Sequence, residues 1–309
     1  MRIAVMGSGG VGGYFGARLA AAGQSVHFLA RGAHLEAMSR NGLEVRSSLG
    51  DLRLHPVHAT GDPARIGPVD IVLFAVKLWD TESAARALDP LLAPDTLVIS
   101  LQNGVEKDDI LRSILPRGHV PGGVCYIASQ VASPGVIAHT GRMQKLVFGD
   151  GGAPAGSANA FLEACREARI DSEISPSIEK TIWEKFVFLV GLSALTTSVR
   201  APIGIVRSHP ETRRLLFGVM EEVVCVGRAK GIPLAQSYAA DRLSFCDSLP
   251  ESMTSSMHND LERGNRMELA WLSGAVVRLG ESLGVPTPLN RVIAGLLAPW
   301  APGRSRVGQ

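Results

Sequence analysis

Six consecutive residues near the N-terminus have the GxGxxG spacing of a dinucleotide-binding turn: Gly7, Ser8, Gly9, Gly10, Val11 and Gly12. In such a turn the first glycine permits a tight bend, and the second leaves room for a pyrophosphate. The third lets the following helix pack close to the preceding strand, so that N–H groups at the helix start face the phosphates. Because the motif follows an apolar run and opens a helical pattern, we expect it to bind a dinucleotide. The alternative is a glycine-rich turn without a ligand.

The residue after the second strand of such a unit distinguishes NAD from NADP. Proteins that bind NAD commonly carry Asp or Glu there, which bonds the ribose 2′-hydroxyl group. This chain has Ala30-Arg31-Gly32 at that point, with no carboxylate. A guanidinium group suits phosphate oxygens, so Arg31 is predicted to bind the 2′-phosphate of NADP(H). The alternative is a solvated surface arginine.

Two further strands are expected to end in polar residues that face a ligand. The apolar run at residues 70–76 is followed by Lys77, and the run at residues 96–101 is followed by Gln102 and Asn103. Ligands of open α/β sheets lie outside the carboxyl ends of the strands. Lys77 could therefore serve cofactor phosphates or substrate, and Asn103 could bond a nicotinamide ribose or a substrate carbonyl. Alternatively, Lys77 is an exposed cap and Asn103 forms a turn before a glycine.

Lys185 is the candidate proton donor. It lies in the segment WEKFVF, at the start of a very apolar helical run. Apolar surroundings make a lysine amine easier to deprotonate, so that it can give up a proton near neutral pH. Reduction of a carbonyl group needs that function, because a proton must reach the oxygen when hydride reaches the carbon. The alternative is a lysine at the helix edge whose ammonium group extends to solvent.

Two polar segments further along the chain, residues 255–261 and 264–269, are expected to lie on helices that line one cleft. In the first segment, Ser256 could bond a substrate carboxylate. In the second, Glu268 is expected to begin a helix. A carboxylate in a first helical turn is also favourable without any ligand, which is the alternative for Glu268.

The order of the elements predicts an α/β domain followed by a helical one. The first strand (residues 2–6), a helix ending at Gly23 and a strand at residues 25–29 form a right-handed β-α-β unit. Other features expected in this domain are strands at 70–76, 96–101 and 120–127, a helix at 81–91, a hairpin at 43–57 and an antiparallel pair at 136–148.

After about residue 175 the strand patterns give way to helices, expected at residues 177–199, 210–230, 234–246, 251–262 and 268–283. We therefore expect an NADP-binding domain with a Rossmann-type, doubly wound sheet at residues 1–174. An all-helical domain for substrate binding or dimerisation should follow at residues 175–309.

Composition excludes several other classes of protein. The chain has 31 basic and 29 acidic residues among 309, a net charge of +2 that gives no case for nucleic acid as a partner. The four cysteines and eight histidines lack the spacing of metal ligands, and a disulfide framework is not expected. The N-terminus does not have the pattern of a signal peptide, and the most apolar stretch, residues 186–195, is about half as long as a membrane span. We expect a soluble, cytoplasmic protein, and the sequence is compatible with a homodimer.

Taken together, the motifs resemble those of the ketopantoate reductase (2-dehydropantoate 2-reductase) family over nearly the whole chain. The matching segments are RIAVMGSGGVGG, FLAR, VKLWDT, QNG, WEKF, SSMHNDL and the glutamate at Glu268. The resemblance implies NADPH-dependent reduction of a 2-oxo acid to a 2-hydroxy acid, as in pantothenate biosynthesis, at a site between a Rossmann domain and a helical domain. The residue roles that it implies are proton donation and substrate contact by Lys185, substrate binding by Asn103 and Ser256, and cofactor binding by Arg31, Lys77 and Glu268.

The chain departs from the family pattern at positions that bind substrate. Family members that reduce ketopantoate carry asparagines one and two helical turns after the lysine, where this chain has Leu189 and Ser193. A third family asparagine falls near Ile203. A site that hydrogen-bonds its ligand discriminates strongly, so lost amides predict a more apolar pocket and a changed substrate. Ser193 is kept among the candidate substrate-binding residues.

Two other interpretations stay open. One is a related two-domain dehydrogenase that acts on another hydroxy acid or a phosphorylated polyol. The other is a non-catalytic sensor that binds NADP(H). The retained Lys185 and Glu268 argue against the sensor, which needs no proton donor.

Overall fold

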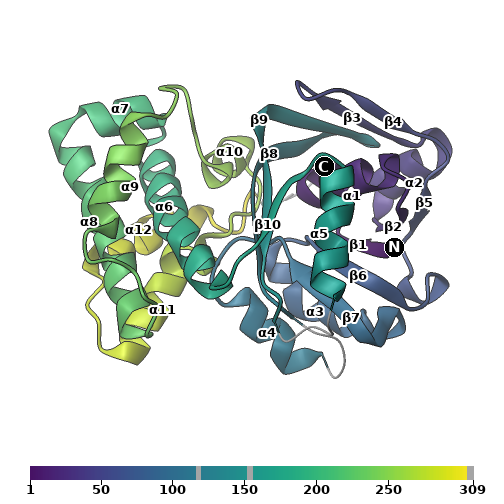
Figure 1. The fold of residues 1–309 in the computed structure, drawn as a ribbon. Coiled ribbons are helices and arrows are strands. Elements are labelled where there is room, and N and C mark those ends of the chain that lie inside the picture. The colour runs from purple at the N-terminus through teal and green to yellow at the C-terminus, as the bar shows by residue number, and fades with distance from the viewer. Residues whose placement is uncertain (116–119, 152–155, 305–309) are drawn as a thin grey trace. The chain divides into compact units, whose positions relative to one another are not determined.

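The computed structural model describes residues 1–115, 120–151 and 156–304, and the chain forms two compact units (Figure 1). The first unit comprises Met1–Asn103 and Lys107–Ile178, and the second comprises Gly104–Glu106 and Glu179–Gln309. The sequence pattern places the domain boundary at residue 174, and the main stretch of the second unit starts at Glu179.

The first unit is built around a five-stranded parallel sheet with the order β5-β2-β1-β6-β7. In that order, the strands are His58–Thr60, Ser25–Leu29, Arg2–Met6, Val69–Phe74 and Leu92–Ser100. The central strand is apolar on both faces because both are covered: Ile3 and Val5 join one core cluster, and Ala4 and Met6 join another. The chain crosses from one side of β1 to the other between β5 and β6. The expected parallel sheet is therefore confirmed, with its topological switch point beside β1.

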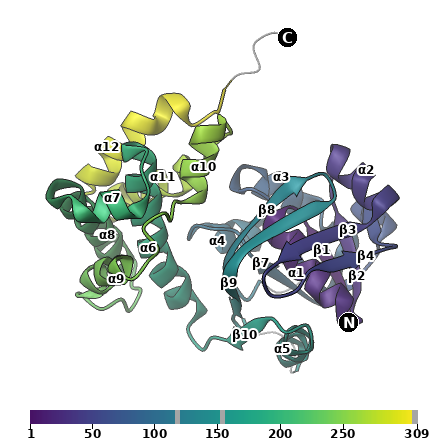
Figure 2. The same cartoon turned by 90° about the horizontal axis from the view of Figure 1, so that it is seen from above.

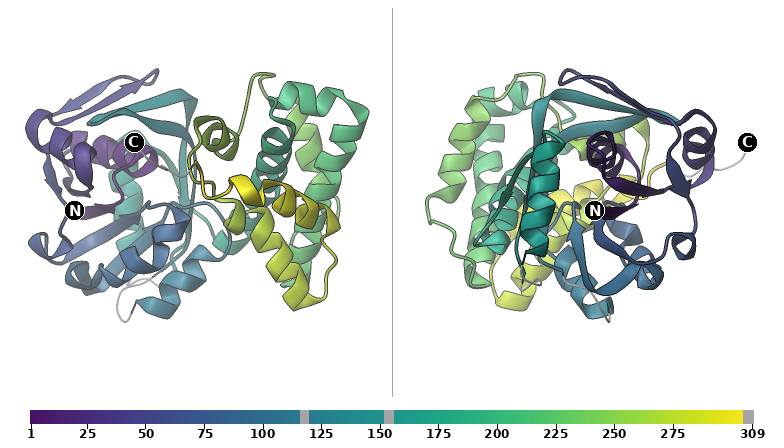
Figure 3. Two further views of the ribbon diagram at one scale, coloured as in Figure 1. Left: turned by 180° about the vertical axis from the view of Figure 1, so that it is seen from behind. Right: turned by 45° about the vertical axis from the view of Figure 1, so that its right-hand side comes forward.

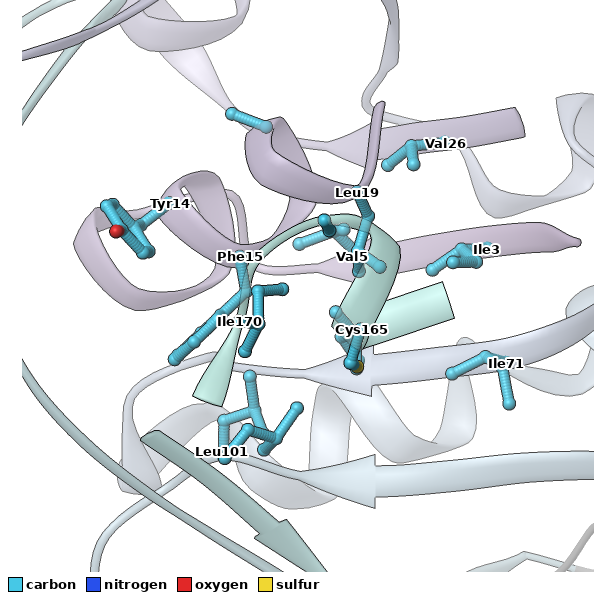
Figure 4. Close-up of a cluster of buried hydrophobic side chains, with 14 of the residues drawn as sticks. Ile3, Val5, Tyr14, Phe15, Leu19, Val26, Ile71, Leu101, Cys165 and Ile170 are labelled. Carbon is cyan, nitrogen blue, oxygen red and sulfur yellow. The ribbon is translucent and has the colours of Figure 1, made fainter. Parts of the chain in front are cut away.

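Helices cover both faces of this sheet. On one face the core includes side chains of α1 (Gly10–Ala21) and α5 (Ser157–Glu167). On the other it includes side chains of α3 (Thr81–Arg86) and α4 (Lys107–Ile114). Figure 4 shows Phe15 and Leu19 of α1 in the first of these clusters, near Val5 of β1 and Cys165 of α5. The sheet is thus doubly wound, as predicted.

Short elements complete this layer. Helix α2 (Gly32–Asn41) packs beside β5. The 3₁₀ turns are Pro63–Arg65, Leu78–Asp80 and Asp89–Leu91. The helix expected over residues 81–91 ends at Arg86, and the last of these turns follows. Pro90 explains the break, because a proline disfavours the α conformation of the residue before it and has no N–H to continue a helix.

A second, mixed five-stranded sheet also belongs to the first unit. Its strands are β3 (Leu43–Ser47), β4 (Leu52–Leu54), β8 (Gly123–Ser133), β9 (Val136–Phe148) and β10 (Asp171–Ile174). The predicted hairpin at 43–57 is confirmed as the antiparallel pair β3–β4. The predicted antiparallel pair within residues 136–148 is wrong, because these residues form the single strand β9 and pair with β8. The chain reverses before them, at Gly135, whose φ is +79°.

Helix α1 contacts strands of both sheets (Figure 3). Its glycines make this possible. A Cβ at Gly16 would lie 2.6 Å from Phe28 Cε1, and one at Gly13 would lie 3.0 Å from Ile137 Cδ1. Small residues on two faces of the helix therefore let the parallel sheet and β9 approach it closely.

The regular elements of the second unit, among the residues that the structure describes, are all helices. Its α-helices are α6 (Ile178–Val199), α7 (Ile203–Ser208), α8 (Pro210–Ala229), α9 (Tyr238–Asp247), α10 (Ser256–Arg263), α11 (Ser273–Leu283) and α12 (Pro288–Leu297), and the 3₁₀ turns are Leu269–Trp271 and Ala298–Trp300. Helix α8 contacts α9, α11 and α12 (Figure 2). A buried carboxylate joins α8 to α12. Glu222 of α8 accepts hydrogen bonds from Leu289 N (2.7 Å) and from Asn290 N (2.9 Å) and Nδ2 (2.8 Å) of α12. Glu222 thus caps the N-terminus of α12.

Three of the expected helices start later than their apolar patterns suggest. Helix α9 starts at Tyr238 rather than residue 234, and α10 starts at Ser256 rather than residue 251. The segment expected to begin with Glu268 forms a 3₁₀ turn first, and α11 starts only at Ser273, after Leu272 leaves helical geometry (φ −105°, ψ −105°). Apolar residues continue across these breaks at roughly helical spacing, so periodicity alone does not locate the helix starts.

Helix α6 is the one described helix that is long and apolar enough to cross a membrane by length and composition. It has 22 residues, more than twice as many as the apolar stretch at residues 186–195, and 67% of its most apolar window is buried. Trp183, Phe186 and Val190 belong to the core of the helical unit. The apolar character of α6 is therefore explained by packing within the unit.

Candidate active site

The glycine turn between β1 and α1 has the geometry that its sequence predicts. Gly7 has a φ of +95°, and a Cβ there would lie 2.8 Å from Val76 N. A Cβ at Gly12 would lie 2.3 Å from the carbonyl oxygen of Gly7, so α1 approaches the turn very closely. A Cβ at Gly9, in contrast, would meet no heavy atom within 4 Å. Gly7 and Gly12 thus lie so close to neighbouring protein atoms that a side chain has no room there. The space beside Gly9 is free, which fits a bound pyrophosphate.

The other motif residues hold this turn in place. Both the backbone N and the side-chain Oγ of Ser8 donate to the carbonyl oxygen of Leu29, each at 3.0 Å. Ser8 is 2% exposed, so its side chain anchors the turn to the end of β2. A Cβ at Gly10 would lie 2.6 Å from Ser129 O of β8, and Val11 packs against the core. The close approach of β8 at Gly10 could not be expected from the motif.

Arg31 stands where a cofactor phosphate could reach it. It follows β2 and directly precedes α2, with an extended backbone (φ −137°, ψ 158°) and an exposed side chain. Strands β1 and β2 are parallel neighbours, paired from Arg2 with Ser25 to Met6 with Leu29. Arg31 and the glycine turn therefore lie at the same, carboxyl edge of the sheet. A guanidinium group at this edge can bind a phosphate.

Lys77 and Asn103 follow the next two strands of the same edge. Lys77 is exposed, with its ammonium group 5.6 Å from the centre of the Trp79 ring, and Asn103 is half-buried. Between them lies Gln102, a buried residue to which the motif assigned no role. Its Nε2 donates to Val76 O at 3.0 Å and to a threonine hydroxyl at 2.8 Å. Gln102 thereby ties the segment carrying Lys77 to the segment carrying Asn103.

Lys185 lies on the second turn of α6, in the helical unit. The residues beside it, Trp183 and Phe186, are each 1% exposed, whereas Lys185 itself is half-buried. Leu189, one turn later on the same face, is also half-buried. The amine is therefore attached to a rigid, apolar helix and is next to an apolar side chain at the position of the first family asparagine.

Ser193, two turns after Lys185, is fully buried, and its hydroxyl has no hydrogen-bond partner among the described residues. The next polar side chain of α6 is partnered: Thr196 Oγ1 lies 3.0 Å from Ser255 Oγ. His258 Nδ1 also lies 2.8 Å from Thr196 O. These bonds hold the start of α10 against α6.

Ser256 is the exposed first residue of α10, and the buried Ser255 caps that helix by accepting from His258 N at 3.0 Å. The first N–H groups of a helix have no intrahelical acceptors and favour an anion. A carboxylate could therefore bind at Ser256. Glu268 is 9% exposed and directly precedes the 3₁₀ turn Leu269–Trp271. It was expected to begin a helix, and it begins this short 3₁₀ turn instead of an α-helix.

The candidate residues thus fall into two sets. The first unit carries an anion-binding turn, two cationic side chains and an amide at one sheet edge. The second carries an amine, a helix N-terminus and a carboxylate on neighbouring helical segments. Among the described parts of the chain, no three His, Cys, Asp or Glu side chains could hold a metal ion. These groups can bind a phosphorylated dinucleotide, hold a carboxylate and deliver a proton.

Comparison with known families finds a match in each of the two units. The family model "Ketopantoate reductase PanE/ApbA" matches residues 3–152, and its C-terminal counterpart matches residues 177–300. A 2-dehydropantoate 2-reductase from Archaeoglobus fulgidus is 32% identical, over 96% of this chain and 96% of its own length. The uncharacterized oxidoreductase YkpB of Bacillus subtilis is 29% identical, over 96% of this chain and 98% of its own.

Solved structures show the same two-domain fold. A PanE/ApbA family ketopantoate reductase from Ralstonia eutropha JMP134 superposes with a TM-score of 0.89 at 36% identity, covering 97% of this chain and 98% of its own. A 2-dehydropantoate 2-reductase from Geobacter metallireducens GS-15 gives 0.87 at 30% identity, covering 97% and 99%. A D-mandelate dehydrogenase solved with NADH and anilino(oxo)acetate shares the fold, with a TM-score of 0.86 at 20% identity.

Proposed function

The chain belongs to the ketopantoate reductase family, and we propose that it reduces a 2-oxo acid to a 2-hydroxy acid with NADPH. The observation that carries the proposal is the open position of Gly9 at the carboxyl edge of a parallel sheet, between the closed positions of Gly7 and Gly12. That edge is where dinucleotides bind in sheets of this topology. When bound, the cofactor would supply the hydride for the carbonyl carbon.

The first unit would hold the cofactor. The N–H groups at the start of α1 would bind the pyrophosphate, and Arg31 would bind the 2′-phosphate. No carboxylate stands in the Ala30-Arg31-Gly32 segment to bond a free 2′-hydroxyl, so NADPH is favoured over NADH. Lys77, Asn103 and the buried Glu268 would complete the cofactor contacts, with Asn103 also within the substrate set.

The second unit would supply the proton. In the direction of reduction, the ammonium group of Lys185 would give its Nζ proton to the carbonyl oxygen, leaving a neutral amine that solvent protonates again. The N-terminus of α10, with the hydroxyl of Ser256, would hold the substrate carboxylate. A rigid helix with a buried Trp183 beside Lys185 suits this role, because general acids act only from a fixed position.

The substrate would carry an apolar group next to its carbonyl. Leu189 replaces an amide that ketopantoate reducers use, and the Ser193 hydroxyl is fully buried without a hydrogen-bond partner among the described residues. A pocket that has lost hydrogen-bonding groups favours a hydroxylated substrate such as ketopantoate less strongly over an analogue without the hydroxyl group. If ketopantoate were nevertheless the best substrate, the reaction would belong to pantothenate biosynthesis.

The proposal is tested by NADPH oxidation in the presence of a series of 2-oxo acids that differ in the size and polarity of the side chain. We expect turnover with several of them, with a higher kcat/KM for bulky apolar members than for ketopantoate. The same series with 2-hydroxy acids and NADP tests the reverse reaction. Binding of NADPH without turnover of any 2-oxo acid would favour the sensor, and ketopantoate as the best substrate by a wide margin would refute the argument from Leu189 and Ser193.

A further inference from the structure

His34 joins three separate segments of the first unit. It is the third residue of α2, which starts directly after Arg31. One ring nitrogen, Nε2, lies 2.9 Å from the carbonyl oxygen of Ser8 in the glycine turn. The other, Nδ1, accepts a hydrogen bond of 3.0 Å from the backbone N of Gly135, at the turn between β8 and β9.

These two contacts fix the protonation of the ring. A backbone N–H can only donate, so Nδ1 must be the unprotonated nitrogen that accepts from Gly135. In a neutral imidazole the proton then sits on Nε2, where it donates to the Ser8 carbonyl. The geometry therefore requires a neutral His34 with the Nε2–H tautomer.

The bond to Ser8 determines the direction of a second group. The carbonyl of Ser8 and the N–H of Gly9 belong to one trans peptide, in which the two groups point in opposite directions. The peptide on the other side of Ser8 is already held, because its N–H donates to the carbonyl of Leu29 at 3.0 Å. The bond from His34 holds the orientation of the Ser8–Gly9 peptide, and with it the direction of the Gly9 N–H, which points away from the Ser8 carbonyl and the His34 ring.

We infer that His34 is a positioning residue for the pyrophosphate of the dinucleotide. It orients the Gly9 N–H as an anion donor by holding the Ser8 carbonyl in the glycine turn. This role rests on the proposed function, since it presumes a dinucleotide at the turn. Its specific consequence is that His34 affects the affinity for the pyrophosphate, whereas Arg31 affects the affinity for the 2′-phosphate.

The inference is tested by binding of two fragments to the whole protein. ADP-ribose carries the pyrophosphate without a 2′-phosphate, and adenosine 2′-monophosphate carries the 2′-phosphate without a pyrophosphate. His34→Ala should weaken ADP-ribose about tenfold, as expected for one lost orienting hydrogen bond, and leave adenosine 2′-monophosphate unchanged. Arg31→Ala should give the opposite pattern. His34→Gln, whose amide can both donate and accept, should recover part of the loss. His58→Ala removes an exposed imidazole from β5 of the same unit and should change neither affinity.

A second readout does not depend on any ligand or variant. In ¹⁵N NMR spectra of the wild-type protein, His34 should show a protonated Nε2 and an unprotonated Nδ1 at neutral pH. The Nδ1–H tautomer, or an ADP-ribose affinity in His34→Ala equal to that of the wild type, would overturn the inference. If the wild type binds neither fragment nor NADPH, the proposed function itself fails.

Discussion

The substitution Gly9→Ala separates cofactor binding from folding. Gly9 has φ −71° and ψ −158°, which alanine adopts without strain, and its Cβ would meet no heavy atom within 4 Å. The folded protein therefore has room for the methyl group. Replacing a glycine by alanine at a compatible position raises stability by about 0.4–1 kcal/mol, because the unfolded chain loses conformational freedom.

In the proposed complex, a pyrophosphate at the glycine turn would occupy the space of that methyl group. A pyrophosphate kept away from the backbone would lose about two charge-assisted hydrogen bonds, each contributing roughly 1.5–3 kcal/mol. The combined loss corresponds to NADPH binding weaker by about 10²- to 10⁴-fold. Gly12→Ala behaves differently, since its Cβ would lie 2.3 Å from Gly7 O and 2.9 Å from Val5 Cγ1. That clash with the fold itself should cost about 1–3 kcal/mol of stability or more.

The assay is a pair of measurements on each variant: NADPH affinity by fluorescence titration and stability by thermal unfolding. We expect Gly9→Ala to keep or raise Tm while losing NADPH affinity, and Gly12→Ala to lower both. Gly295→Ala is the matched control, because this glycine is an exposed residue of α12 and a Cβ there meets nothing within 4 Å. An NADPH affinity of Gly9→Ala within a factor of about two of the wild type would refute the argument, since no close phosphate approach would then exist.

The remaining predictions concern cofactor choice, stability and thiol reactivity. Arg31→Ala should reduce the preference for NADPH over NADH in kcat/KM by about 10²-fold, and a wild type that uses both equally would contradict the proposed role. Glu222→Ala should lower the free energy of unfolding in urea by about 2–4 kcal/mol, because it leaves the buried start of α12 without its acceptor; a loss under about 1 kcal/mol would show that the cap is dispensable. Burial raises the pKa of Cys165 to about 12 and that of Cys246 to about 11, so iodoacetamide at pH 8 should modify exposed Cys225 first, although its pKa is also raised by desolvation. Mass spectrometry identifies the labelled cysteine, and Cys165 and Cys246 should be modified only after the protein is unfolded. Labelling of either thiol in the folded protein before Cys225 would contradict the prediction.

Much of the first unit could be predicted because its signals are local. The strand at residues 2–6, the glycine turn and the strand at residues 25–29 follow one another within a short stretch, and each element carries its own pattern. The second sheet could not be predicted in this way. Strand β3 pairs in parallel with β9, with Glu44 opposite Val136, and no property of either strand specifies so distant a partner. Parallel pairing across the chain is decided by tertiary packing rather than by local propensity.

The candidate site shows the same division. The residues proposed to contact a ligand could be singled out from motifs, because their chemistry is visible in their type and spacing. His34 was not singled out, and Gln102 was given no role of its own, because each acts through other residues. Their partners, the backbone of Gly135 for His34 and that of Val76 for Gln102, become neighbours only in the folded unit. A histidine three residues after the predicted phosphate-binding arginine is the signal that could have pointed to His34.

Proton donation by Lys185 is the central claim, and one comparison of kinetics and binding tests it most directly. Single-turnover reduction of the best 2-oxo acid should slow by about 10²- to 10⁴-fold in Lys185→Ala, the usual contribution of a general acid, while the NADPH affinity stays at the wild-type level. Lys185→Arg should restore little, because a guanidinium group hardly gives up a proton near neutral pH. Lys180→Ala is the matched control on the same helix, where the lysine pairs with Glu184 at 3.7 Å, and it should leave the rate unchanged. A Lys185→Ala protein that reduces its best substrate at a near wild-type single-turnover rate would remove Lys185 from the mechanism and require another proton donor.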